Sequence, residues 1–151
     1  MRLFVCGPTV YDAAHLGHAK TALNFDFIVR YLRSRGLAVT YVQNITDIDD
    51  KILGRAAREG VSWRIVADQS TAMYIEDMRA LGVTSVTKYA KATDYIPAMI
   101  SQIERLLRTG HAYITTDGVF YDVSTFQAMP GSQGEPRRRA ATLCLEWTRA
   151  R

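Results

Sequence analysis

The residues best suited to chemistry in this chain lie close together near its beginning. They are one thiol, two imidazoles and two glycines, at Cys6, Gly7, His15, Gly17 and His18. A short apolar run precedes them and a long helical pattern follows, so they are expected at a junction of strand, loop and helix. Such junctions bind phosphate groups in α/β proteins, and we interpret this one as a nucleotide site.

The two histidines are three residues apart at the expected start of the helix, so both side chains can point the same way. A helix N-terminus presents unpaired N–H groups and the positive end of the helix dipole. Gly17 has no Cβ, so a base or ribose can lie against the backbone there. Imidazole N–H groups directed at an α-phosphate would stabilise the charge that develops when a carboxylate attacks it. The alternative is that His15 and His18 only cap the helix, and the pattern His-x-Gly-His alone does not decide between the two.

The surrounding pattern predicts a βαβ unit that positions this stretch. Residues 3–5 form an apolar strand that a Gly-Pro pair ends, and residues 17–35 carry apolar side chains at near-helical spacing up to a stop at Gly36. Residues 39–45 are β-branched and aromatic, which is typical of a second strand. Because ligands of open α/β sheets bind at the carboxyl ends of strands, the loops after both strands are expected to face one crevice.

An acidic loop, residues 46–50, follows the second predicted strand. Its carboxylates, at Asp47, Asp49 and Asp50, could hold Mg²⁺. They could instead cap a helix that begins at Lys51 and interact with that lysine. We favour capping.

The following residues are predicted to form three helices and a hairpin. The helices cover residues 51–59, residues 63–81 after a capping Ser62, and a segment that opens at Thr93. The buried stripe of the third helix is predicted to be Ile96, Ile100, Ile103, Leu106 and Leu107. Residues 112–123 carry the signature of a hairpin. We interpret the other large side chains as packing residues, namely Trp63, Met73, Tyr74, Met78, Tyr89 and Tyr95.

The positive charge of the chain lies mainly at its end. The net charge is +4, and residues 129–151 hold five Arg and two Glu, a net charge of +3. The charge is therefore weak evidence that the remaining residues bind nucleic acid. The same segment is rich in turn-forming residues, so we predict a boundary near residue 128 and an irregular, solvated basic tail over residues 129–151.

The composition favours a protein of the cytoplasm. The two cysteines are far apart in the sequence, which argues against a disulfide framework. No apolar run approaches the roughly 20 residues that span a bilayer. The apolar run at the beginning, residues 3–5, is too short to be the apolar part of a signal peptide. We therefore expect a cytoplasmic protein with no membrane partner.

Two long motifs closely resemble those of the cysteinyl-tRNA synthetases, which are class I synthetases. They are Cys6-Gly7-Pro8-Thr9-Val10-Tyr11-Asp12 with His15-Leu16-Gly17-His18, and residues 44–52 after the second strand. Residues 30–32 and 117–123 are similar as well. The resemblance covers residues 2 to about 126. It implies an α/β fold with a Rossmann-type (HUP-like) parallel sheet and flanking helices, of which the second half is incomplete here. Residues 1–128 would then be the nucleotide-binding half of the catalytic domain with the start of an insertion.

The resemblance also implies roles for individual residues. His15 and His18 match the catalytic histidines of the family's ATP-binding signature. The remaining nucleotide contacts would be Pro8, Thr9 and Gly17, and the cysteinyl-adenylate pocket would include Gly7, Thr9, Thr21, Asn44 and Thr46. Cys6 matches the first protein ligand of a zinc ion. The thiolate of a substrate cysteine would bind Zn²⁺ far better than the hydroxyl of serine, so the metal would select cysteine over serine. The alternative for Cys6 is a small buried residue at the end of a strand.

The activity implied is the ATP- and Mg²⁺-dependent activation of cysteine and its transfer to tRNA(Cys). The family's other zinc ligands, its Lys-Met-Ser-Lys-Ser loop and its anticodon-binding region have no match in this sequence, so Zn²⁺ and tRNA binding are less supported than ATP binding. One alternative is a mycothiol-ligase relative that joins activated cysteine to an amino-sugar, although residues 50–52 are more similar to the synthetases. Another is a non-catalytic module that binds a nucleotide or a partner chain.

Overall fold

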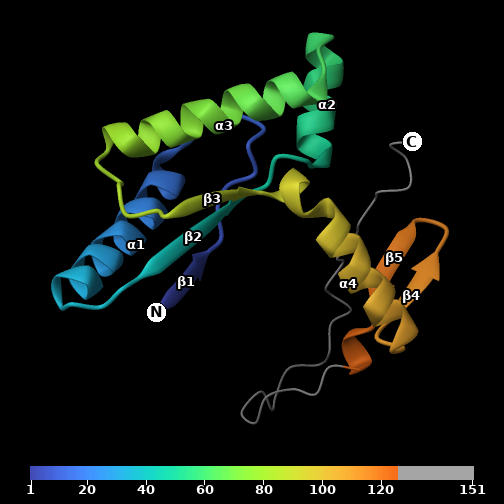
Figure 1. The fold of residues 1–151 in the computed structure, drawn as a ribbon. Coiled ribbons are helices and arrows are strands. Elements are labelled where there is room, and N and C mark those ends of the chain that lie inside the picture. Colours follow the sequence, from blue (N-terminus) through green and yellow to red (C-terminus); the bar gives the residue numbers. More distant parts are fainter. Residues whose placement is uncertain (126–151) are drawn as a thin grey trace. The chain divides into compact units, whose positions relative to one another are not determined.

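The computed structural model describes residues 1–125, which belong to two compact units (Figure 1). The first unit is Met1–Tyr95, and the second begins at Ile96. The boundary predicted near residue 128 and the basic tail over residues 129–151 lie outside the described residues and stay predictions. No helix within residues 1–125 has the length and apolar character needed to cross a membrane.

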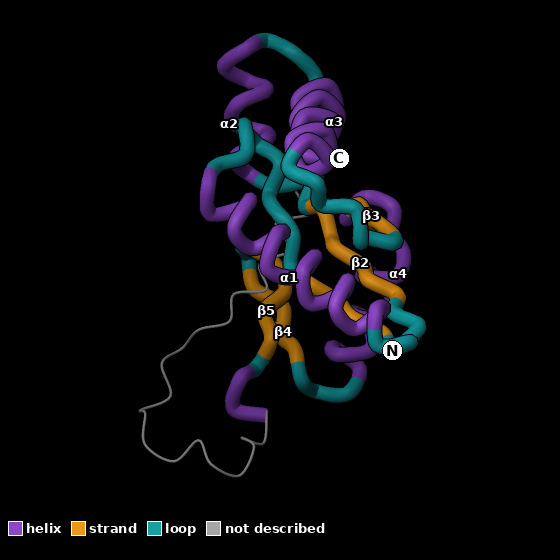
Figure 2. The backbone as a smooth tube through the Cα atoms, turned by 90° about the vertical axis from the view of Figure 1, so that its left-hand side faces the viewer, coloured by secondary structure: helices purple, strands orange, loops and turns teal. Residues whose placement is uncertain are grey.

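The first unit is a three-stranded parallel sheet with helical connections, as predicted for an α/β fold (Figure 1). The strands lie in the order β1-β2-β3, and helices connect each strand to the next. The elements along the chain are β1 (Arg2–Val5), α1 (Leu16–Ser34), β2 (Thr40–Ile45), α2 (Asp50–Glu59), α3 (Trp63–Ala80), β3 (Lys88–Lys91) and a short 3-10 helix (Ala92–Tyr95). Helices α2 and α3 are consecutive and joined by a short loop (Figure 2).

Local capping residues set the ends of the helices, as the sequence predicts. The side chain of Asp49 accepts a hydrogen bond at the start of α2, and Ser62 does the same at the start of α3. Gly60 ends α2 with a left-handed backbone conformation (φ 66°). These contacts involve only neighbouring residues, so sequence patterns identify them well.

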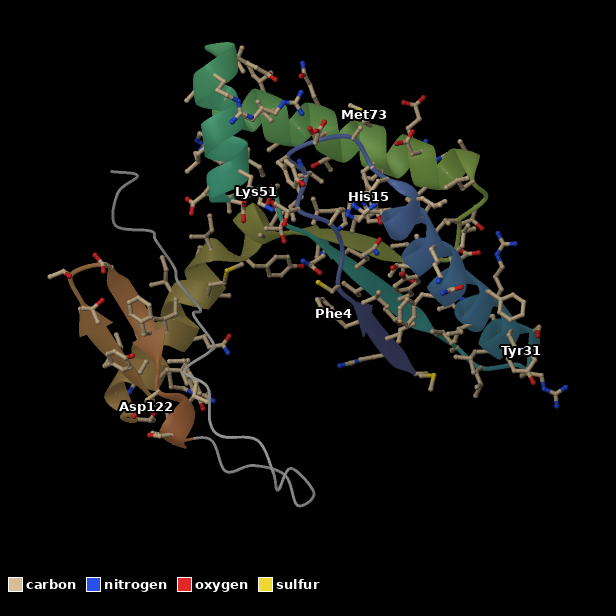
Figure 3. The ribbon with its side chains drawn as sticks, turned by 180° about the vertical axis from the view of Figure 1, so that it is seen from behind. Phe4, His15, Tyr31, Lys51, Met73 and Asp122 are labelled. Carbon is tan, nitrogen blue, oxygen red and sulfur yellow. The ribbon has the colours of Figure 1, made fainter. Side chains whose placement is uncertain are left out.

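The core lies on one face of the sheet. Alternate residues of β2 point to this face, and Tyr41 and Ile45 are fully buried there. Tyr41 packs with residues of α1, whereas Ile45 belongs to a cluster that also holds residues of α3. On the opposite face, Phe4 of β1 is 66% exposed (Figure 3). Helices α1 and α3 therefore pack on the same face of the three strands.

The third strand is not predicted by the sequence pattern. Its residues, Lys-Tyr-Ala-Lys, are few and carry a lysine at each end, so no apolar alternation marks them. Pairing with β2 defines the strand, with Gln43 opposite Tyr89 and Ile45 opposite Lys91. This contact is remote in sequence, which is why local propensity does not reveal it.

The second unit contains α4 (Ile96–Arg108) and an antiparallel hairpin of β4 (Ala112–Thr115) and β5 (Gly118–Tyr121). The predicted helix and hairpin are confirmed. The predicted buried stripe is confirmed only in part: Ile96, Ile103, Leu106 and Leu107 are half-buried, no residue of α4 is fully buried, and Ile100 is 43% exposed. Within residues 96–125, α4 has a two-stranded hairpin and a short 3-10 helix (Val123–Thr125) to pack against, which is too little surface to bury an apolar helix face completely.

Candidate functional site

The loop after β1 pairs with the end of β2. The backbone N–H of Thr46 donates to the carbonyl of Pro8 at 3.0 Å, and the N–H of Val10 donates to the carbonyl of Thr46 at 3.1 Å. Thr9 and Thr46 form a parallel bridge between these bonds. The two loops that the sequence places at the carboxyl ends of neighbouring strands are thus joined by backbone hydrogen bonds.

Gly7 approaches β2 so closely that no side chain fits. Its N–H donates to Oδ1 of Asn44 at 2.8 Å. A Cβ on Gly7 would lie 1.7 Å from the carbonyl oxygen of Asn44 and 2.9 Å from Cγ of Gln43. The amide of Asn44 also donates to Oγ1 of Thr46, at 3.3 Å. The predicted site residues of both loops therefore form one connected polar group.

His15 lies where the loop enters α1 (Figure 3), and His18 lies beside it in the first turn of the helix. His15 is the N-cap residue, and its Nδ1 accepts a hydrogen bond from the N–H of Gly17 at 3.1 Å. Nδ1 of His18 accepts from the N–H of His15 at 3.3 Å, which completes a reciprocal capping box. The rings are stacked, with centroids 3.9 Å apart and planes inclined by 21°. Capping by both histidines is therefore confirmed.

Capping leaves the other ring nitrogens available. Because both Nδ1 atoms accept hydrogen bonds, each neutral ring carries its proton on Nε2. Neither Nε2 makes a recorded hydrogen bond within residues 1–125, so His15 and His18 offer two neighbouring N–H donors. Gly17 leaves room for this arrangement, since a Cβ there would lie 2.9 Å from Cε1 of His15.

The environment of His18 favours its neutral form. Desolvation by burial lowers the pKa of His18 below the ordinary value of 6.5, and the neighbouring His15 lowers this pKa further. A neutral imidazole keeps Nδ1 as the acceptor that the capping box requires. The same ring can then donate from Nε2 to an anionic ligand.

Two further predicted site residues are Thr21, in α1, and Cys6, directly after β1. Oγ1 of Thr21 donates to the carbonyl of Gly17 at 3.1 Å, one turn into α1. Cys6 is a free, exposed thiol at the end of β1, so its alternative interpretation as a small buried residue is wrong. Within residues 1–125 no three His, Cys, Asp or Glu side chains are grouped to hold a metal ion. The donor set around Cys6 therefore does not fit a four-ligand zinc site by itself.

The acidic loop caps and ties elements of the fold. Oδ1 of Asp49 accepts from the N–H of Lys51 at 2.9 Å, which confirms capping of α2. Asp47 is buried and accepts hydrogen bonds from the N–H and the hydroxyl of Thr93. Asp50 is the first residue of α2. Two of the three carboxylates thus have structural partners within residues 1–125, which supports their role in capping and in tying the fold.

Two side chains of helix α2 contact Tyr11 in the loop before α1, which sequence reasoning missed. Nη1 of Arg55 donates to the carbonyl of Tyr11 at 2.8 Å, and Nε of the same side chain pairs with Glu59 at 2.7 Å. Nζ of Lys51 lies 4.9 Å from the centre of the Tyr11 ring. Lys51 and Arg55 are four residues apart, a spacing that places both on one helix face. That spacing was the available signal, but it does not say what the face contacts.

A buried tyrosine also reaches the site. Tyr74 of α3, which the sequence pattern assigns to packing, is only 3% exposed. Its ring meets the ring of His18 edge to face, with centroids 6.4 Å apart and planes at 89°. No pattern in the sequence distinguishes this tyrosine from others that only pack.

Comparisons with known proteins agree on one family. The model of the tRNA synthetases class I (C) catalytic domain matches residues 1–137. A cysteine–tRNA ligase of Thermoplasma acidophilum is 51% identical over 126 residues, covering 83% of this chain and 28% of the relative. A cysteine–tRNA ligase of Trichlorobacter lovleyi is 50% identical over 126 residues, covering 83% of this chain and 26% of the relative.

The fold also matches solved structures. A methionyl-tRNA synthetase of Mycobacterium tuberculosis, solved in complex with methionyl-adenylate, superposes with a TM-score of 0.68 at 22% identity. The match covers 74% of this chain and 23% of that structure. This likeness confirms the Rossmann-type class I fold. The chain spans about a quarter of the length of the relatives that it matches.

Proposed function

This chain belongs to the family of class I tRNA synthetase (C) catalytic domains, and from that premise we propose that it takes part in the ATP-dependent activation of cysteine and its transfer to tRNA(Cys). The curated relatives quoted above are named cysteine–tRNA ligases, so neither amino-sugar ligation nor a purely non-catalytic role is favoured. The proposed activity is that of the whole protein, and residues 1–125 would contribute the part of its active site that binds ATP.

The observation that carries the proposal is the stacked pair of imidazoles at the start of α1. Each offers an Nε2–H at the positive end of a 19-residue helix. In the proposed reaction a carboxylate oxygen of cysteine bonds to the α-phosphorus of ATP. The bond from that phosphorus to the bridging oxygen breaks, and pyrophosphate leaves with the electron pair. The N–H groups of His15 and His18 would stabilise the negative charge that grows on the α-phosphate oxygens.

The neighbouring residues would position the two reactants. Backbone hydrogen bonds hold the loop after β1 against the end of β2, and this loop leads directly to the histidines. We propose that ATP contacts this loop and the start of α1, and that cysteine lies closer to β2. The proposed ATP contacts are Pro8, Thr9, His15, Gly17 and His18, and the proposed cysteine contacts are Gly7, Thr9, Thr21, Asn44 and Thr46.

For metal ions we propose one protein ligand for zinc and Mg²⁺ that binds together with ATP. Cys6 is proposed as a single zinc ligand, supported by its exposed thiol beside the proposed cysteine contacts. No group of three ligands that could hold the ion is found within residues 1–125, so no step is assigned to zinc. Mg²⁺ is proposed to arrive with ATP, because phosphate oxygens are its usual ligands. We also propose that the protein acts in the cytoplasm, without a membrane partner.

A direct test measures nucleotide binding and exchange in the 151-residue chain. ATP is titrated by calorimetry, and cysteine-dependent exchange between ATP and pyrophosphate is then measured at high protein concentration. His18→Ala is expected to weaken ATP binding about tenfold, the effect of losing one hydrogen bond to a charged group. His111→Ala is the matched control, since His111 is the remaining histidine of the chain and is not among the proposed site residues. ATP binding that is equal in wild type and His18→Ala would overturn the proposed role of the histidines, and no exchange would overturn activation by this chain.

A further inference from the structure

Tyr74 is held in place by the sheet beneath it. Its hydroxyl donates to Oε1 of Gln43 at 3.1 Å, and both side chains are almost completely buried. On another side, the ring of Tyr89 meets Tyr74 edge to face, with centroids 6.3 Å apart. Tyr74 is thus fixed from β2 and from β3 at once, it packs in the main core cluster, and its ring also contacts His18.

Gln43 connects this tyrosine to the loop that follows β1. It is a polar residue at an inward-facing position of β2, where the alternation predicts an apolar one. Its Cγ lies 2.9 Å from the position that a Cβ on Gly7 would take. Contacts therefore run from Gln43 through Tyr74 to His18, and the side chain of Gln43 occupies the space beside Gly7 that a Cβ there would need.

We propose that Tyr74 is a positioning residue for His18, whose ring it holds against His15 so that the two Nε2 atoms face the same ligand. The consequence for ATP rests on the function proposed above, but the positioning itself does not. Without the ring of Tyr74, the His18 side chain would rotate more freely and would be more exposed to water. Its Nδ1 would then no longer be held to the N–H of His15.

The groups that face His18 support this role. Its titratable neighbours are His15, stacked on one side, and Tyr74, edge-on from α3. Burial raises the pKa of Tyr74 to about 12, so the tyrosine stays neutral at physiological pH. None of the ion pairs recorded within residues 1–125 involves His18. Exclusion of water is therefore the main effect that Tyr74 can exert on the imidazole, consistent with the lowered pKa of His18.

The test is a proton NMR titration of the histidine rings in the 151-residue chain. Tyr74→Leu is expected to raise the pKa of His18 toward 6.5 and to weaken ATP binding about tenfold, the loss of one oriented hydrogen bond. Tyr74→Phe keeps the ring and is expected to restore both values. Met78→Ala is the matched control, because Met78 is 1% exposed in the same helix and core cluster and has no recorded contact with His18. It should lower stability without moving the pKa of His18.

A folded Tyr74→Leu protein with an unchanged His18 pKa would overturn the proposal. If this variant does not fold, nuclear Overhauser effects between the rings of His18 and Tyr74 in the unchanged protein decide the matter, and their absence would overturn it. If the His18 pKa shifts as expected while the unchanged protein fails to bind ATP, the positioning stands and the proposed function fails. The two proposals are therefore separable.

Discussion

The backbone N–H of Gly7 donates to the side chain of Asn44 at 2.8 Å, and the two backbones are so close that a methyl group cannot be placed between them. This contact joins the loop after β1 to the end of β2. It brings the predicted site residues of both loops together, because the remaining backbone bonds follow from the same close approach.

Gly7→Ala is therefore expected to destabilise the chain strongly. The added Cβ would lie 1.7 Å from a backbone oxygen, so the loop must separate from β2. We expect a loss of more than about 3 kcal/mol in the free energy of unfolding, measured by urea denaturation. Gly54→Ala is the matched control, since its Cβ would meet only the end of Arg58 at 3.9 Å within α2. That change should stabilise the protein by up to about 1 kcal/mol, and equal effects of the two changes would contradict the steric argument.

Asp26 of α1 is a buried carboxylate that ties the loop before β3 to the helix. Oδ1 accepts from the N–H groups of Thr84 and Ser85, and Oδ2 pairs with Arg30 at 2.7 Å. Burial by itself would raise the pKa of Asp26. The hydrogen bonds from Ser85 and Thr84 and the charge of Arg30 outweigh burial and lower this pKa below 3.8. The carboxylate therefore stabilises the fold at pH values above 3.8, and this contribution is lost as pH falls through the lowered value.

Asp26→Asn is expected to cost about 2 kcal/mol at pH 7, because the charged acceptor of two buried N–H groups is lost. The difference in free energy of unfolding between wild type and variant should shrink as pH falls below about 4. Urea denaturation at pH 7 and at pH 3 measures both values. A difference that does not depend on pH would show that the charge of Asp26 is not what stabilises this loop.

The capping box at the start of α1 is expected to make stability depend on pH near neutrality. The pKa of His18 is lowered in the folded chain, so the unfolded chain binds its proton first as pH falls. The stabilisation is complete above pH 6.5 and is lost as pH decreases from 6.5 through the lowered value. Urea denaturation between pH 5 and 8 should show this slope, and His18→Gln should reduce it. An unchanged slope in the variant would assign the effect to other groups.

Arg55 is expected to support ligand binding from outside the site. Its bond to the carbonyl of Tyr11 holds the loop that leads to His15. Arg55→Ala should weaken ATP binding about tenfold, as expected when one charged hydrogen bond that orders a loop is lost. Arg58→Ala, an exposed arginine of the same helix, is the control and should bind ATP like wild type. Calorimetric titration measures both, and equal binding by all three proteins would show that α2 does not order the loop.

The sequence by itself determined the features that depend on neighbouring residues. The starts of α1, α2 and α3 follow from His15, Asp49 and Ser62, because an N-cap needs only a side chain within one turn of the N–H from which it accepts. The family was equally readable, because its two motifs are continuous stretches. The proximity of His15 and His18 also follows from the sequence, because the two residues are three positions apart at the start of one helix.

The tertiary structure decided what depends on contacts between distant residues. Strand β3 exists because it pairs with β2, and the stripe predicted as buried on α4 is only half-buried because the described part of its unit offers little surface to cover it. The contact of Tyr74 with His18 also joins residues that are far apart in the sequence. Each of these contacts forms only when separate elements pack together, so the pattern of one segment cannot contain it. The histidine site therefore has a local shape that the sequence predicts and a supporting environment that only the fold supplies.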